Sequence, residues 1–264
     1  MIINQLIKID MSKSDNVNLV LGREEVYNAS SQICYAFRRG TDERNGIVLS
    51  LGNMVSGYPF MLGGVRFHNS ECAYIAGAFS DCTEEHLALQ ERLAECTNGY
   101  MAKKSIRKPH EALIRADWES FNVQWMLYVV WTKCLGNADF RKVLLSLPVD
   151  AVIIEDSTFQ NGRTATIWGT KNTELKSHLN RLKKELKAKG MTKASIKREL
   201  DAMRLGEWAN VGVFRGKNIM GKILMACRDA LRNGSEPQID YALLREKRIN
   251  LRGHLLTFEV AEAA

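Results

Sequence analysis

Apolar residues recur at helical spacing in some segments of the chain and form short continuous runs in others. The strongest helical pattern lies between Ala116 and Leu135, where a broad apolar face is made by Trp118, Phe121, Trp125, Tyr128 and Val129. Shorter helices are expected from Glu71 to Phe79 after a cap at Asn69 or Ser70, from Thr83 to about Asn98, and before Pro148. Strand or strand-and-turn patterns cover residues 33–40, 47–54, 58–67 and 151–156. The pattern predicts an α+β fold dominated by helices, with a small sheet.

A different pattern occupies residues 172–206. Leucines repeat at four-three spacing before Gly190, and Thr192 can cap a second helix with its own narrow apolar stripe. This segment therefore predicts an inserted helical hairpin. The segment from Lys171 to Arg204 carries eleven Lys and Arg against four Asp and Glu, and this accounts for the whole formal charge of +7. Three interpretations stay open for its basic surface: a solvated helical face, a clamp on nucleic-acid phosphates, or an arm that binds another protein.

Composition excludes several classes of protein. The chain has 264 residues, 45% hydrophobic and 25% charged, which is ordinary for a soluble protein, and it has no apolar run long enough to span a membrane. Its start is too polar for a secretory signal, so we expect a cytoplasmic protein with no membrane partner. The six cysteines and five histidines are dispersed without metal-ligand spacing, so no metal and no other cofactor is expected. We expect one domain over residues 33–232, between an N-terminal extension (1–32) and a charged, peripheral C-terminal tail (233–264).

Several residues could take part in chemistry. Glu71 opens an apolar helix, where it either compensates the helix dipole or faces a pocket. Glu155 and Asp156 end an apolar strand, as functional carboxylates or as solvated turn charges. Two tryptophans, Trp118 and Trp168, could stack on a base or pack in the core.

The segment RGKNIMGK supplies backbone N–H groups and lysines ahead of a helix. This arrangement suits a phosphate, contacted by Lys217 and above all by Asn218, although it also fits a helix cap with Gly221 at a close contact. Arg38 and Arg39 could approach an anionic substrate from the end of another strand.

Four separated pieces occur in one order: LGN…YPF…FHNSE…AY, then DWE…K, then IIED…IWG, then GKNIMGKILM. Together they resemble the NADAR superfamily of small α+β N-glycosidases, over about Ile33 to Arg232. Known members cleave phosphorylated intermediates of riboflavin synthesis or remove ADP-ribose from modified guanine in nucleic acid. The family's functional positions fall on Ser70, Glu71, Trp118, Glu119, Lys133, Glu155, Trp168, Gly169, Gly216, Asn218 and Gly221.

The chain departs from the family pattern at two positions. Ala78 stands where relatives carry a lysine that is thought to attack the ribose, and Ala165 stands where they carry an acid. Lys133 could replace the missing amine if it reaches the pocket.

The resemblance implies an N-glycosidase of a ribosyl nucleotide. Glu71, Glu155 and Lys133 would be catalytic, and Ser70, Trp118, Asp156, Trp168, Gly169, Lys217, Asn218 and Gly221 would bind substrate. The expected partner is a nucleotide or an ADP-ribosylated substrate, with nucleic acid held by the basic hairpin. Because of the two departures, a nucleotide-binding or nucleic-acid-binding protein with weakened catalysis is the alternative.

Overall fold

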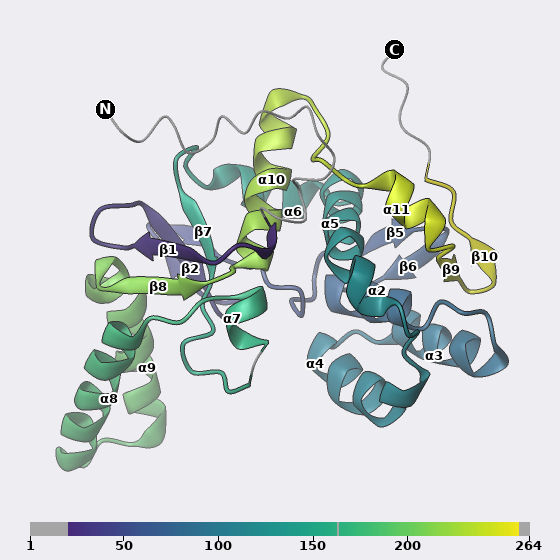
Figure 1. The fold of residues 1–264 in the computed structure, drawn as a ribbon. Coiled ribbons are helices and arrows are strands. Elements are labelled where there is room, and N and C mark those ends of the chain that lie inside the picture. The colour runs from purple at the N-terminus through teal and green to yellow at the C-terminus, as the bar shows by residue number, and fades with distance from the viewer. Residues whose placement is uncertain (1–20, 163, 259–264) are drawn as a thin grey trace.

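The computed structural model describes residues 21–162 and 164–258, and helices predominate in this part of the chain (Figure 1). The strands are short and pair two by two: β1 (Glu25–Asn28), β2 (Cys34–Phe37), β3 (Glu43–Arg44), β4 (Ile47–Val48), β5 (Phe60–Leu62), β6 (Val65–Phe67), β7 (Val152–Glu155), β8 (Val213–Gly216), β9 (Asn250–Leu251) and β10 (His254–Leu255). The α-helices are α2 (Ser70–Ala78), α3 (Glu84–Glu95), α4 (Gly99–Met101), α5 (Trp118–Gly136), α6 (Ala138–Ser146), α7 (Ala165–Trp168), α8 (Thr173–Ala188), α9 (Lys193–Leu205), α10 (Ile219–Asn233) and α11 (Tyr241–Glu246). Tighter or wider helical turns form η2 (Ala102–Arg107), η3 (Lys108–Leu113) and η4 (Glu207–Asn210). The predicted α+β class is confirmed.

Two of the buried helices pack directly on each other at the centre of the molecule. Every residue of α2 is buried, which explains why its sequence is apolar on all sides rather than along one stripe. The indole of Trp125 in α5 donates to the carbonyls of Ala73 and Tyr74 at 3.2 Å, so the helix contact also satisfies the only polar atom of that side chain. The buried position of α2 fixes where Glu71 lies.

The strand pair that leads to the site is parallel. β2 pairs with β7 so that Phe37 lies opposite Glu155, and both strands end at the same edge. α10 packs on β7, and β1 pairs with β8 in antiparallel register. The predicted strands at 33–40 and 151–156 are therefore adjacent, although more than a hundred residues separate them.

The inserted hairpin forms as predicted and is anchored at its base. Asn172 caps α8 and Thr192 caps α9, each accepting a hydrogen bond from a backbone N–H in the first turn. Leu175 and Leu179 of α8 join a small second core with Phe214 of β8, and the hairpin extends away from the strands on that side (Figure 1).

Both ends of the described chain pack into the fold. The sequence instead predicted an N-terminal extension and a peripheral C-terminal tail outside the domain. Residues 25–28 form β1, whereas residues 1–20 of the predicted extension lie outside the described part. The segment after Asn233 was expected to be peripheral because it is charged, yet it places Leu244 and Ile249 in the main core with no exposed surface.

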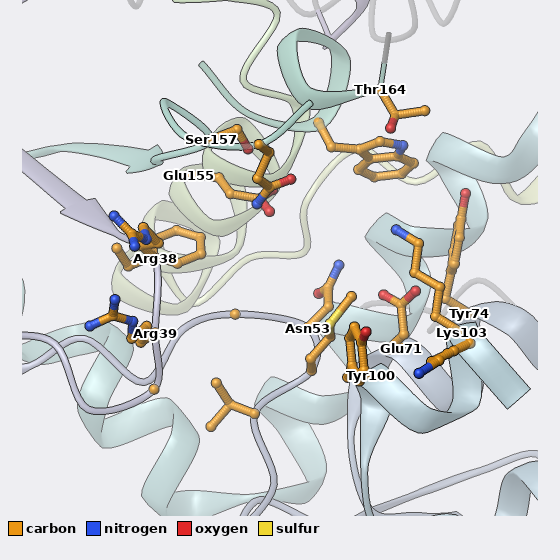
Figure 2. A pocket seen from close by; sticks show the side chains of 18 of the residues that line it. Arg38, Arg39, Asn53, Glu71, Tyr74, Tyr100, Lys103, Glu155, Ser157 and Thr164 are labelled. Atoms are coloured by element: carbon orange, nitrogen blue, oxygen red, sulfur yellow. The ribbon is translucent and has the colours of Figure 1, made fainter. Parts of the chain in front are cut away.

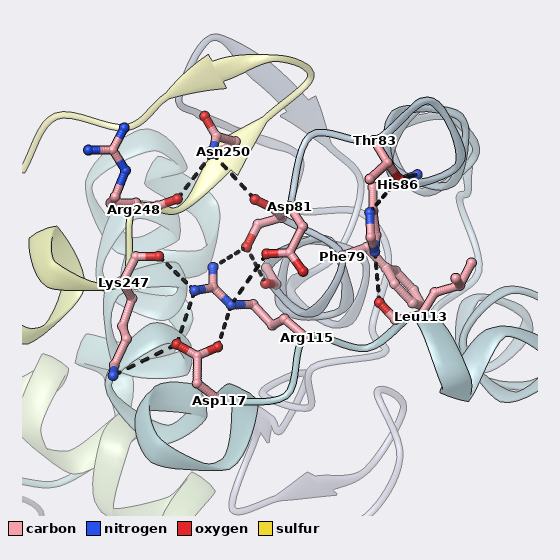
Figure 3. Close-up of polar contacts among 12 residues, drawn as sticks. Phe79, Asp81, Thr83, His86, Leu113, Arg115, Asp117, Lys247, Arg248 and Asn250 are labelled. Carbon is pink, nitrogen blue, oxygen red and sulfur yellow. Dashed lines mark hydrogen bonds and ion pairs between the residues drawn. The ribbon is translucent and has the colours of Figure 1, made fainter.

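A half-buried arginine ties this C-terminal segment to the helices (Figure 3). Arg115 donates to the Lys247 carbonyl at 2.7 Å, to Ser80 Oγ at 2.8 Å and to the Asp117 carboxylate at 2.6 Å. Its guanidinium also lies 4.9 Å from the centroid of the Phe121 ring. The C-terminal segment thus covers the ends of α2 and α5, and the charges in its sequence face outward or pair.

Candidate active site

A cavity of about 870 Å³ opens where β2 and β7 end and α2 begins. Its walls come from the turn after β2, the Gly52–Val55 loop, the first turns of α2, the segment from Tyr100 to Glu111, the end of β7 and Trp168. Glu71 and Glu155 point into it from different walls (Figure 2). The edge where parallel strands end is a usual position for a binding site in proteins that contain them.

Glu71 is held at the start of α2 by two backbone interactions. Asn69 caps the helix, because its side-chain oxygen accepts a hydrogen bond from the N–H of Cys72 at 3.0 Å. The N–H of Glu71 donates to the Asn53 carbonyl at 3.0 Å. The side chain is only 7% exposed, and this burial raises the pKa of the carboxyl, while the positive charges of Lys103 and Arg107 act in the opposite direction. A carboxylate withdrawn from water into a cavity does more than compensate a helix dipole, so the pocket interpretation of Glu71 is favoured.

Glu155 ends β7 and is half-buried. Its pKa is raised to about 7, first by burial and then by the negative charge of Glu71, with Lys103 acting in the opposite direction. Two carboxyl groups that face one cavity and repel each other do not both ionise easily near neutral pH. Two carboxyl groups with raised pKa values therefore face this cavity, and the positive charges of Lys103 and Arg107 partly offset the effect of burial on Glu71.

One wall of the cavity is basic, and it was not predicted from the sequence. Lys103, Lys104, Arg107 and Lys108 line the cavity from η2 and the start of η3. Their spacing of one, three and four residues places them together on one side of a helical segment, and this was the signal available in the sequence. With Arg38 and Arg39 from the turn after β2, they make the cavity suited to an anionic ligand.

Aromatic side chains form a further part of the lining. Trp168 and Tyr74 line the cavity and pack edge to face, with ring centroids 5.4 Å apart, and Tyr100 lies nearby (Figure 2). Trp118 does not line the cavity. It is 2% exposed and packs behind Tyr74, and the centroids of the two rings are 4.9 Å apart. Trp168 therefore lies in the cavity lining, and Trp118 lies in the core.

Asn218 and Gly221 lie behind the cavity, where they hold β7. Asn218 Oδ1 accepts from the N–H of Glu155 at 3.0 Å, and its Nδ2 donates to the Ile153 carbonyl at 2.8 Å. A Cβ on Gly221 would lie 2.2 Å from that same Ile153 carbonyl oxygen, so only glycine lets α10 approach β7 this closely. These two residues position Glu155 rather than line the cavity.

Gly169 and Asp156 also lie against this strand end. A Cβ on Gly169 would be 2.6 Å from the Glu155 carbonyl oxygen, so the chain after α7 runs directly beside β7. Asp156 lines the cavity and is 1% exposed, and Arg204 of the hairpin approaches its carboxylate at 3.7 Å. The Asp156 side chain, which was predicted to bind substrate, is therefore already close to a cation.

Lys133 lies in the core and not at the cavity. It has no exposed surface, its Nζ has no hydrogen-bond partner in the described structure, and it lies 3.8 Å from the centroid of the Phe140 ring. Burial lowers the pKa of this lysine to about 7. Ala78 is also buried, at the end of α2 remote from Glu71. The structure therefore does not bring Lys133 together with Glu71 and Glu155.

Two other predicted contacts lie outside the cavity lining. Ser70 is the first residue of α2 and is 1% exposed, with Glu71 rather than Ser70 facing the cavity. Lys217 is half-buried, and its N–H donates to the Thr166 carbonyl at 2.7 Å. Of the residues predicted from the sequence to act on or bind substrate, the cavity brings together Glu71, Glu155, Asp156 and Trp168.

Two features are absent from the described residues, a metal-binding cluster and a membrane-spanning helix. No group of three or more His, Cys, Asp or Glu side chains among them is arranged to hold a metal ion. Within the same residues, no helix combines the length and apolar character needed to cross a membrane.

Comparisons with known proteins give a distant structural similarity. No family model and no curated protein sequence matches this chain. The chain is similar to the NMR structure of the E. coli protein YbiA, with 19% sequence identity, coverage of 77% of this chain and 88% of that one, and a TM-score of 0.47. The similarity is too distant to assign a family or an activity.

Proposed function

We propose that this protein is an N-glycosidase that hydrolyses the bond between a ribose and a base in an anionic nucleotide. The observation that supports the proposal is the pair of carboxyl groups, Glu71 and Glu155, which face one cavity with a basic wall. The resemblance of the sequence to N-glycosidases, described from the order of its motifs, points to the same reaction class.

In this proposal the two carboxyl groups have different roles. Glu155, with a pKa of about 7, gives its proton to the leaving nitrogen as the C1′–N bond breaks. Glu71 stays ionised beside Lys103 and Arg107, stabilises the positive charge that develops on C1′ and the ring oxygen, and takes a proton from the attacking water. Water adds to C1′, and the proton returns from Glu71 to Glu155 through solvent, which closes the cycle.

The cavity favours a substrate with phosphate groups. Six cationic side chains line it, from Arg38, Arg39, Lys103, Lys104, Arg107 and Lys108, and the stacking surface of Trp168 can take a base or ribose. ADP-ribose on guanine in nucleic acid and a phosphorylated riboflavin-pathway intermediate are the two substrates that the family resemblance suggests. We favour the first because two cations of the cavity lining, Arg38 and Arg39, also border the basic hairpin.

The second candidate is a protein that binds such a nucleotide without cleaving it. Ala78 is buried where relatives carry a lysine, and Lys133 does not reach the cavity, so a mechanism that requires an amine nucleophile from either position has none here. The carboxylate mechanism above does not require that amine. Binding without sugar release would favour this second candidate.

The test combines substrates with one conservative substitution. The protein is incubated with an ADP-ribosylated oligonucleotide, with free ADP-ribose and with aminopyrimidine riboside phosphates, and sugar release is followed by mass spectrometry. Glu71→Gln keeps the shape of the side chain and removes the charge, so we expect sugar release to fall at least about 100-fold while the far-ultraviolet circular dichroism spectrum is unchanged. Glu111→Gln, which changes another acid on the cavity lining, is the matched control. Undiminished turnover in Glu71→Gln would remove Glu71 from the mechanism.

A further inference from the structure

A second cavity, of about 470 Å³, lies between the hairpin and the turn after β2. We call it the hairpin groove; it is lined by Arg38, Arg39, Phe159, Leu179, Asn180, Lys183, Lys187, Lys193, Ile196, Lys197, Leu200, Asp201 and Arg204. Arg38 and Arg39 line the first cavity as well. The two cavities therefore share a wall made of two arginines, and a ligand that leaves the first cavity over this wall enters the hairpin groove.

The charges around the hairpin groove are not neutralised from within the protein. Lys183 and Lys187 come from α8, and Lys193 and Lys197 come from α9. All four are exposed, and in the described part of the chain none of them forms an ion pair. A run of lysines on a solvated face would diverge into water, whereas these converge from two helices around one hollow.

The one acid in the lining does not change this balance. Asp201 forms an ion pair with Arg39, and its carboxylate also lies 3.9 Å from Arg204. It is therefore committed to two cations that already belong to the same wall. The four lysines remain available to an anion from outside the protein.

An aromatic side chain stands in the same lining. Phe159 is 38% exposed on the loop that follows Glu155, and the Arg38 guanidinium lies 5.2 Å from the centroid of its ring. Lys176 of α8 lies 6.0 Å from the same centroid. An exposed ring bordered by cations is the arrangement with which proteins stack an unpaired base beside its phosphate.

We propose that the hairpin groove binds single-stranded nucleic acid, with a base on Phe159 and phosphates on the lysines of α8 and α9. The volume suits one nucleotide-sized unit rather than the two backbones of a duplex, and stacking on Phe159 requires an unpaired base. The strand continues over Arg38 and Arg39 into the first cavity, where its ribosyl unit meets Glu71 and Glu155; this last step rests on the proposed function. The hairpin thereby selects a polynucleotide over a free nucleotide.

The test measures binding of an unmodified, fluorescently labelled single strand of about 12 nucleotides, within the length that such sites cover, by anisotropy. The double variant Lys183→Glu/Lys187→Glu is compared with Lys184→Glu/Lys189→Glu, which makes the same charge change on exposed α8 or α8-end residues outside the lining. We expect the first pair to weaken binding at least about tenfold, and the second pair to weaken it less than about threefold. The neutral pair Lys183→Gln/Lys187→Gln should lower the slope of log K against log salt by about 1.4, which is about 0.7 for each lost phosphate contact. Phe159→Ala should weaken binding by about 5- to 100-fold.

Several results would overturn the proposal. If the lining pair and the control pair lose the same affinity for the single strand, the lysines act only through the overall charge of the hairpin. If a duplex of the same length binds equally well or more tightly, the groove is not a single-strand site. Sugar release from a free nucleotide by the wild-type protein, without any binding of the single strand, would leave the N-glycosidase proposal intact and remove the groove. Binding through the groove without sugar release from any substrate would support the groove and remove the N-glycosidase proposal.

Discussion

Glu155 is the residue whose protonation sets the pH dependence of the proposed reaction. Its pKa is about 7 because burial and the negative charge of Glu71 both disfavour the anion. A general acid acts only when it is protonated and a general base only when it is ionised. We therefore expect kcat/KM to fall about tenfold per pH unit well above 7, and also to fall toward acidic pH, where Glu71 takes up a proton. The measurement is the rate of sugar release between pH 5 and 9. An activity that instead rises through pH 7 would assign Glu155 the role of a base.

Stability gives a separate check on the same carboxyl group. Its pKa in the folded protein, about 7, lies above the ordinary value of 4.5, so the folded state is favoured fully below pH 4.5 and loses that contribution as the pH rises through 7. At about 1.4 kcal/mol per pKa unit, the loss approaches about 3.5 kcal/mol at pH 8 or above. Glu155→Gln should therefore be inactive yet melt at a higher temperature than the wild type at pH 8. The two proteins should melt at similar temperatures near pH 4.

Lys133 offers the opposite case, a buried base with no proposed role in catalysis. Its pKa is lowered from 10.5 to about 7 by burial, so the cost of holding it in the core is complete below pH 7 and disappears as the pH rises above 10.5. Lys133→Met keeps a long unbranched side chain and should raise the free energy of unfolding by about 2–4 kcal/mol at pH 6. Thermal melts at pH 6 and pH 10 should show the larger gain at pH 6. The exposed Lys142→Met, in the neighbouring α6, is the control and should change little at either pH. A folded Lys133→Met protein that has lost sugar release would return this lysine to the reaction.

Elements whose ends carry a local signal were predicted from the sequence. Asn69, Thr83 and Thr192 each cap the helix that follows them, because the hydrogen bond involves only the next few backbone N–H groups. The long helix α5 was predicted because aromatic residues recur at helical spacing from Trp118 to Tyr128, over about three turns. Local chemistry was enough to define these elements.

Some elements that depend on distant partners were not predicted. β1 and β8 are each four residues long and exist because they pair with each other, across nearly two hundred residues. The charged segment after Asn233 looked peripheral because it has few apolar residues. Those residues, such as Leu244, enter a core built by other parts of the chain. No periodicity in either segment could have shown this.

The candidate site was predicted in the same uneven way. Glu71 and Glu155 were found because each stands next to an apolar run, where a charge is conspicuous in the sequence. Asn218 was predicted to contact a phosphate of the substrate. Its side chain instead forms hydrogen bonds with the backbone of β7 and does not line the cavity. The basic wall at η2 was missed because Lys103 and Arg107 resemble ordinary surface charges until the fold turns them toward the two carboxyl groups.

At the scale of the whole molecule, one buried arginine joins the hairpin to the site. Arg204 of α9 is 4% exposed, and its guanidinium lies 2.7 Å from Asp42 and 3.7 Å from Asp156. Asp42 in turn accepts hydrogen bonds from the backbone N–H groups of Arg38 and Arg39, at 2.8 and 3.0 Å. The hairpin, the shared arginine wall and the end of β7 are therefore held together by one ionic cluster.

Removal of this arginine should separate the hairpin from the body of the protein. Arg204→Met leaves Asp42 and Asp156 buried at 2% and 1% exposure without their main cation, which typically costs about 3–5 kcal/mol. For a chain of this size the melting temperature should fall by roughly 6–20 °C. Limited proteolysis should show faster cleavage near Gly190 and Gly206, at the two ends of α9, because that helix has lost its anchor. Arg198→Met, an exposed position on the same helix, should leave both readouts unchanged. If the two variants melt at the same temperature, the cluster does not couple the hairpin to the site, and the groove and the first cavity act as independent surfaces.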